Sequence, residues 1–201
     1  PMPLTSPSDS TALTEAEKRV WQDVDFMPLK QKVWVKLEAV LVDFQESILS
    51  MPTSQSFRQK GAKLSRGENH YSYSYRVMDA IRQYEGEDLL LFRAVMLWGH
   101  PIGIHFICTG KWQARFDVEM LEGLGRNLIS LRINSQANPW EWRFEDESMP
   151  LIQSRSKQEI EAILTQRDFL KLSLFLSTDQ YQDLAGEGER MWTAIAYSLG
   201  I

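Results

Sequence analysis

The chain has 201 residues, of which 43% are hydrophobic and 24% charged, and its formal net charge is −5. This composition is that of an ordinary globular protein, and the length suffices for one domain that buries roughly 70% of its unfolded surface. The acidic balance, with no extended basic stripe, argues against nucleic acid as a partner. No apolar run is long enough to cross a membrane and one cysteine excludes an internal disulfide, so we expect a cytoplasmic protein.

The N-terminal part of the chain is predicted to be helical after a flexible start. Residues 1–11 are rich in Pro, Ser and Thr and are predicted to be flexible, and residues 12–201 are predicted to form a single domain. Thr14, which acidic residues follow, is typical of a helix start. The apolar residues of 29–48 recur at helical spacing over about five turns, and Met51–Pro52 ends this second helix.

A polar stretch follows the helices. Residues 52–69 hold few apolar side chains and are interpreted as a long loop, a feature that is usually functional or disordered. A strand with an aromatic face is predicted where Tyr71, Tyr73 and Tyr75 alternate with serines and an arginine. Residues 80–88 are predicted to connect this strand to the next one.

The most apolar stretch, residues 89–109, is predicted to be a β-hairpin in the centre of a sheet. The predicted turn is Gly99–His100, which places Arg93 opposite Phe106 and puts His105 on the other face of the sheet. The alternative is a single buried helix, but two glycines and a proline close together disfavour it.

The remainder of the chain alternates between helices and strands. The predicted elements are, in order, a helix after Gly110 that ends at Gly123 or Gly125, strands at 128–134 and 140–144, a helix that begins with the capping box Ser156–Glu159, a strand at 170–176 and a last helix capped by Thr178. This order indicates an α+β fold. We expect a single domain with a mainly antiparallel sheet of about five or six strands, backed by N-terminal, middle and C-terminal helices.

A polar motif carries a resemblance to a known family. The run Lys63–Tyr71, which contains Arg-Gly-Glu-Asn, and the following Tyr75–Asp79 resemble a motif in a family of uncharacterised bacterial cytosolic proteins. The turn Trp98–Gly99 is similar to that family's hairpin turn, and the block Trp140–Asp146 is a weaker match. The family has histidines after the first tryptophan of that block, whereas this chain has Trp142-Arg143. The resemblance spans residues 60–150, implies no activity, and marks the Arg-Gly-Glu-Asn run as a shared feature.

The motif is also the best candidate for a binding site. In a polar pocket beside the sheet, an arginine would clamp an anion, and a glutamate or histidine would move a proton. The alternative is a structural turn, in which the glycine turns the chain and its polar neighbours cap backbone groups. The candidate ligand-binding residues are Arg66, Glu68, Asn69, His70, Tyr71, Asp79 and Arg93. Because a buried arginine is costly without a partner, Arg93 is expected to form a structural ion pair with Glu68, Asp79 or Glu141.

Other chemistries find no support in the sequence. The three histidines, His70, His100 and His105, show no metal-ligand spacing, and Cys108 is interpreted as a small buried hydrophobic residue. There is no phosphate-binding glycine motif and no hydrolase elbow. We therefore predict no metal, no cofactor and no identifiable catalytic residue.

Two functional hypotheses follow. The leading one is a non-enzymatic cytosolic protein that binds a partner or a small-molecule ligand and forms a homodimer through its aromatic-rich sheet or helix faces. The alternative is an enzyme or an anion-binding module built on the loop from Arg66 to His70. The two differ in whether these side chains converge in one concave pocket.

Overall fold

The computed structural model describes residues 11–60, 62–144 and 147–201, and residues 58–60 are described by their backbone alone. The chain divides into two compact units, residues 1–37 and residues 38–201. The segment predicted to be flexible, residues 1–11, lies outside the described residues except for its last member.

The described part of residues 1–37 is helical, as predicted. Helix α1 (Glu15–Gln22) begins with a capping box, in which the Thr14 hydroxyl accepts from the backbone of Glu17 and the Glu17 side chain reaches back to the backbone of Thr14. Helix α2 (Phe26–Ser50) follows after three residues, and the Asp23 carboxylate accepts from the first backbone N–H of α2 at 3.1 Å. No residue of α1 is buried.

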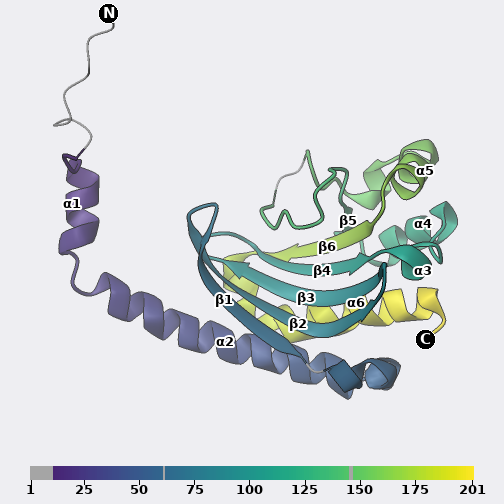
Figure 1. The fold of residues 1–201 in the computed structure, drawn as a ribbon, viewed down its shortest axis with the longest axis horizontal. Helices are drawn as coiled ribbons and strands as arrows, with labels where there is room; N and C mark the ends of the chain where they lie inside the picture. The colour runs from purple at the N-terminus through teal and green to yellow at the C-terminus, as the bar shows by residue number, and fades with distance from the viewer. Residues whose placement is uncertain (1–10, 61, 145–146) are drawn as a thin grey trace, which may run out of the picture. The chain divides into compact units, whose positions relative to one another are not determined.

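Residues 38–201 are built around one antiparallel sheet (Figure 1). Among the described residues the sheet has six strands in the spatial order β1-β2-β3-β4-β6-β5, so β6 pairs with β4 although the chain between them is long. The strands are β1 (Lys63–His70), β2 (Tyr73–Glu85), β3 (Asp88–Leu97), β4 (Ile102–Cys108), β5 (Arg132–Ile133) and β6 (Leu170–Leu176). This antiparallel sheet with its helices confirms the α+β class.

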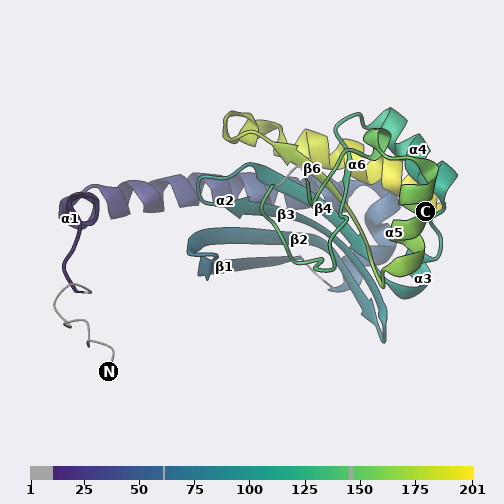
Figure 2. The same ribbon diagram turned by 90° about the horizontal axis from the view of Figure 1, so that it is seen from above.

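One face of the sheet is apolar, and helices cover it. In Figures 1 and 2, α6 runs along this face. Phe92 of β3 is fully buried between Phe44 of α2, at a ring distance of 5.8 Å, and Trp192 of α6, at 5.3 Å. The helices of this unit are the second half of α2, the 3₁₀ helix η1 (Pro52–Lys60), α3 (Gly110–Gln113), α4 (Val118–Asn127), η2 (Ile152–Ser154), α5 (Lys157–Gln166), η3 (Thr178–Asp183) and α6 (Leu184–Leu199).

The central hairpin forms as predicted, but its register differs by one residue. Arg93 pairs with His105 rather than with Phe106, because the paired strands are centred on Gly99 rather than between Gly99 and His100. In this turn Gly99 has a φ of +78°, and His100 N–H donates to the carbonyl of Leu97. A slip of one residue moves every side chain of a strand to the other face. Arg93 and His105 therefore share a face, and the prediction that separated them is wrong.

The polar run that was interpreted as a loop is instead the 3₁₀ helix η1 and the edge strand β1. Strand β1 lies at the sheet edge and pairs with β2 alone, so it needs no alternating apolar residues. For this reason the period-two pattern that indicates a strand is absent from its sequence. Gly67 does not turn the chain, because it lies within β1, paired with Tyr75. Its lack of a side chain leaves room for the Tyr75 ring, since a Cβ at this position would lie 2.3 Å from that ring. The predicted connection 80–88 is also wrong, since β2 continues to Glu85 through a bulge after Asp79.

Other element boundaries need correction too. Helix α4 continues through both glycines, and a Cβ on Gly125 would lie 2.9 Å from the buried Ile152. The predicted strand 128–134 shrinks to β5, and residues 140–144 form no strand. Helix α5, with its Ser156 capping box, and β6 are confirmed. Thr178 does not cap the last helix directly, because η3 intervenes before α6.

A matched pair of glycines in α6 tests how the helix packs on the sheet. A Cβ on Gly188 would lie 2.4 Å from the ring of Phe44, whereas nothing lies within 4 Å of one on Gly186. We expect Gly188→Ala to reduce the free energy of unfolding by about 1–3 kcal/mol, because overpacking outweighs the gain in helix propensity. Gly186→Ala should raise it by about 0.5–1 kcal/mol. Chemical denaturation measures both, and equal effects would contradict this packing.

Candidate functional site

The seven candidate residues do not form one pocket. Arg66 pairs with Arg76 across β1 and β2, on the face that the helices cover. There its guanidinium donates twice to the Glu38 carboxylate, at 2.8 and 2.7 Å, and Arg76 donates to the same carboxylate at 2.6 Å. These hydrogen bonds, led by that of Arg66, hold the pKa of Glu38 at about 2. Arg66 thus ties β1 to α2 and is committed to a structural contact.

Asp79 and Arg93 lie on the opposite face of the sheet. Arg93 Nε is 2.8 Å from Asp79 Oδ1, and both side chains are buried. The predicted structural ion pair of Arg93 is thereby confirmed, with Asp79 as its partner. Burial raises the pKa of Asp79 in spite of the nearby guanidinium.

The ion pair belongs to a polar row that crosses five strands. Each member pairs with the next across a strand boundary: Asp79 of β2, Arg93 of β3, His105 of β4, Ser173 of β6 and Arg132 of β5. His105 Nδ1 lies 2.8 Å from Ser173 Oγ, and the imidazole is fully buried. Burial, together with the charges of Lys171 and Arg93, keeps the pKa of His105 well below its usual value, so the ring is neutral. The hairpin register places this row on one face.

A short irregular stretch, residues 139–144, lies over the polar row, and we name it the cover segment. Trp140 lies over the Arg93 guanidinium at 5.3 Å, and the Phe144 ring contacts the Phe175 ring at 5.0 Å. The backbone carbonyl of Glu141 accepts from the buried Lys171 amine. The Asn138 side chain accepts from the backbone of Trp140, and such local bonds replace the ladder of the predicted strand.

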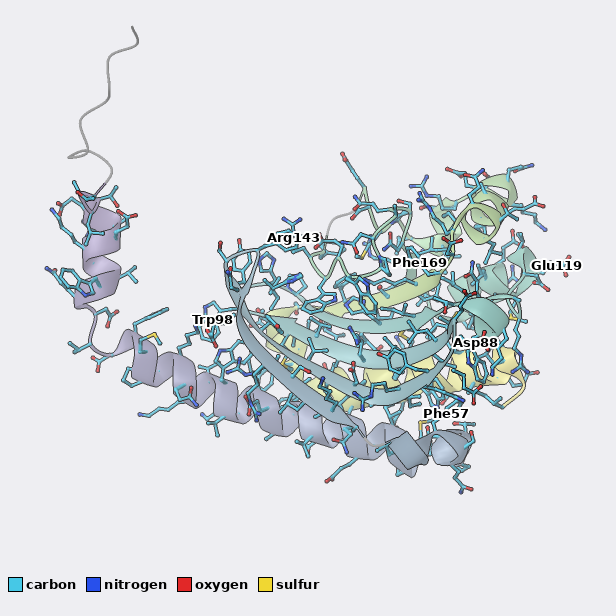
Figure 3. All side chains as sticks on the ribbon, in the orientation of Figure 1. Phe57, Asp88, Trp98, Glu119, Arg143 and Phe169 are labelled. Atoms are coloured by element: carbon cyan, nitrogen blue, oxygen red, sulfur yellow. The ribbon has the colours of Figure 1, made fainter. Side chains whose placement is uncertain are left out.

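His70 and Tyr71 meet the cover segment at the β1–β2 end of the sheet. The His70 ring stacks on Trp142 at 4.2 Å, and burial lowers the pKa of His70. The Arg143 guanidinium, labelled in Figure 3, lies 4.0 Å from the centre of the Tyr71 ring. Tyr71 is a turn residue with a φ of +50°, so it does not continue the tyrosine face of β2. These two candidates therefore hold the cover segment in place.

Glu68 and Asn69 are exposed at the sheet edge. The Glu68 carboxylate lies 3.5 Å from an Arg76 nitrogen, on the helix-covered side with Arg66. Two hollows of this unit lie elsewhere: one of about 1080 Å³ between α4 and α6, and one of about 880 Å³ that α3, α4 and α5 line. Neither includes a candidate residue. The candidate residues of the Arg-Gly-Glu-Asn run thus line neither of these hollows.

Lys171 is a residue that sequence reasoning missed. It alternates with the leucines of β6, a pattern that predicts a solvent-exposed side chain, yet Lys171 is only 1% exposed. Burial lowers its pKa to about 7, the charge of Glu141 opposes this shift, and that of Arg93 adds to it. One feature of the sequence could have indicated that this face of β6 is buried. The residues that alternate with the leucines are a lysine, a serine and a phenylalanine, a mixture uncommon on a solvent-exposed face.

Glu141 is the acidic centre of the cover segment. It accepts from the backbone of Arg143 at 2.8 Å and from the Arg143 guanidinium at 3.1 Å. Burial works to raise the pKa of Glu141, but the hydrogen bonds of Arg143 outweigh it and hold the pKa at about 2. The carboxylate is therefore ionised at neutral pH and already occupied, which leaves it little capacity to act as a general base.

Comparison of the chain with protein-family models, curated proteins and solved structures finds no match. The family resemblance of the Arg-Gly-Glu-Asn motif stays a prediction. Within the described residues no helix has the length and apolar character needed to cross a membrane, and no three metal-ligating side chains gather.

The pH dependence of stability tests the burial of Lys171. With a folded pKa of about 7 and a higher unfolded pKa, the unfolded state binds more protons between these values. The lysine therefore makes the free energy of unfolding rise as pH increases from 7 towards 10. We expect Lys171→Met to remove this rise. The free energy of unfolding of the wild type should therefore increase relative to that of the variant between pH 7 and pH 9. Urea denaturation at both values measures the difference, and parallel curves would contradict a buried amine.

Proposed function

We propose that the protein is a non-enzymatic, cytoplasmic binding protein that assembles with a second copy of itself through residues 12–37. The observation that carries the proposal is the exposure of large apolar side chains on these helices. Val24 is 83% exposed and Trp21 78%, and neighbouring positions continue the patch. The exposed apolar members are Leu13, Val20, Trp21, Val24, Phe26, Met27, Leu29, Val33 and Val35. An apolar patch of this kind is typical of an interaction surface.

The charge pattern of the same segment favours a second copy as the occupant. Between residues 12 and 25, four carboxylates outnumber two basic side chains, whereas residues 26–37 carry three lysines and no acid. Two copies that pack antiparallel would each place their acidic half on the basic half of the other. The apolar positions Phe26, Leu29 and Val33 follow helical spacing, so they form a stripe along one helix face.

The sheet face is a weaker candidate for the interface. Its aromatic residues already contact the chain itself: Trp142 lies 5.4 Å from the Tyr75 ring, and Tyr73 contacts His100 at 4.4 Å. The enzymatic alternative, built on the loop from Arg66 to His70, is less well supported, because Arg66 is bound to Glu38 whereas His70 stacks on Trp142.

Solution mass across a range of concentrations tests this proposal. We expect wild type to be a dimer, and Trp21→Glu with Val24→Glu to shift it to a monomer with unchanged thermal stability. Tyr197→Glu, at an 87% exposed position of α6, is the matched control and should leave the dimer intact. A monomeric wild type, or a dimer that survives both arm substitutions, would overturn the proposal.

Charge reversal tests the antiparallel arrangement itself. Lys32→Glu with Lys36→Glu should weaken the dimer, and Glu15→Lys with Glu17→Lys in the same chain should restore it. Failure of the second pair to restore the dimer would refute antiparallel packing.

A further inference from the structure

The polar row contains a buried arginine whose hydrogen-bonding capacity is largely unused. Arg93 is 7% exposed, and its guanidinium has one ionic partner, Asp79, reached through Nε. Among the residues that the structure describes, Arg93 Nε and Asp79 Oδ1 are both buried without a well-oriented hydrogen bond, although they lie 2.8 Å apart, and no hydrogen bond joins a terminal nitrogen of Arg93 to an acceptor. A guanidinium carries five donors, and buried donors without acceptors are rare in folded proteins.

The neighbours of Arg93 are also short of acceptors and of negative charge. Nε2 of the fully buried His105 has no hydrogen-bond partner among the described residues. Lys171, which is also buried, gives its amine to a backbone carbonyl rather than to a carboxylate. The field of Arg93 disfavours protonation of both Lys171 and His105. Three cationic side chains, those of Arg93, Lys171 and Arg132, thus share one face with a neutral imidazole. The carboxylates near them are those of Asp79 and of Glu141, and Glu141 is already bound by Arg143.

We propose that Arg93, His105 and Lys171 form a binding site for a small oxyanion beneath Trp140. A carboxylate or phosphate oxygen would accept from the terminal nitrogens of Arg93, to which planar oxyanions are complementary. Bound negative charge would also offset the repulsion between Arg93 and Lys171. The inference does not depend on self-association, because the site lies within one copy and uses no residue of 12–37.

Trp140 would control the access of a ligand to Arg93. Its ring lies over the Arg93 guanidinium, yet the residue is 41% exposed, so rotation of one surface side chain uncovers the arginine. Gly103 on the same face accommodates the His105 side chain, because a Cβ there would lie 2.4 Å from His105 Nε2. The ring of His105 therefore occupies the volume above the glycine, with Nδ1 fixed by Ser173.

Thermal unfolding of the full chain, at constant ionic strength and pH 6.5, tests the site. Sodium phosphate and sodium acetate each replace sodium chloride in separate titrations. We expect at least one to raise Tm in a saturable manner that chloride does not reproduce. A response to phosphate alone assigns a phosphate-bearing ligand, and a response to acetate alone assigns a carboxylate. A linear or absent response to both salts would overturn the proposal.

Variants locate the response. Asp79→Val with Arg93→Met removes both partners of the ion pair and should abolish the rise in Tm. The control Arg126→Met, at a side chain 71% exposed on α4, should retain that rise. If the double variant does not fold, Lys171→Met and Trp140→Ala serve instead, and each should weaken apparent affinity at least tenfold. Lys171→Met should in addition remove the loss of affinity expected for wild type between pH 6.5 and pH 9. Unchanged affinity in both would refute the site.

Discussion

Replacement of Asp79 by alanine is expected to lower the free energy of unfolding by about 3–5 kcal/mol, because it leaves Arg93 buried without a counter-charge. The loss should be recovered when Arg93 is replaced as well. Asp79→Val with Arg93→Met substitutes apolar groups for the pair, and such replacements are often neutral or stabilising. Urea denaturation of the single and double variants gives both values.

An exposed ion pair is the appropriate control. Arg190 and Glu187 lie 2.6 Å apart on the surface of α6, and Glu187→Ala should cost less than about 1 kcal/mol. A cost for Asp79→Ala as small as this would show that the buried pair contributes no more than a surface one. Failure of the double variant to recover stability would point instead to a specific need for the charges.

Phe92→Ala is expected to destabilise the protein by about 3–5 kcal/mol, because it opens a cavity between α2, α6 and the centre of the sheet. Phe92→Leu should reduce the free energy of unfolding by less, since the leucine side chain fills most of the cavity that alanine would leave. Tyr197→Ala, at the most exposed aromatic position of α6, should change stability by no more than about 0.5 kcal/mol. Equal effects of Phe92→Ala and Tyr197→Ala would contradict the assigned core.

Much of the fold could be predicted from local patterns. Thr14 and Ser156 start helices through capping boxes, and the apolar runs of the β3–β4 hairpin and of β6 form the centre of the sheet. These features depend on neighbouring residues or on strong hydrophobic burial, which a sequence displays directly. Strand β1 was missed because an edge strand requires neither.

The candidate site was only partly predictable. Asp79 was one of the three partners predicted for Arg93, but a turn centred on Gly99 shifted the register and brought His105 to the same face. Which face a polar residue occupies depends on a single residue in a turn, and periodicity cannot determine it. Lys171 was missed because its burial depends on the cover segment, whose position rests on side-chain contacts rather than on a repeating pattern.

The strand order also affects how the protein is made. The partner of β4 on one side is β6, which leaves the ribosome roughly 70 residues after β4. At bacterial and eukaryotic synthesis rates this delay is roughly 3–14 s. During that interval the hairpin partner β3 protects one edge of β4, while the other edge, with Ile104 and Phe106, offers free backbone groups to any neighbouring nascent chain. Aggregation during synthesis is therefore expected to depend on how soon β6 arrives, and chaperone binding to chains stalled before Leu170 would reveal it.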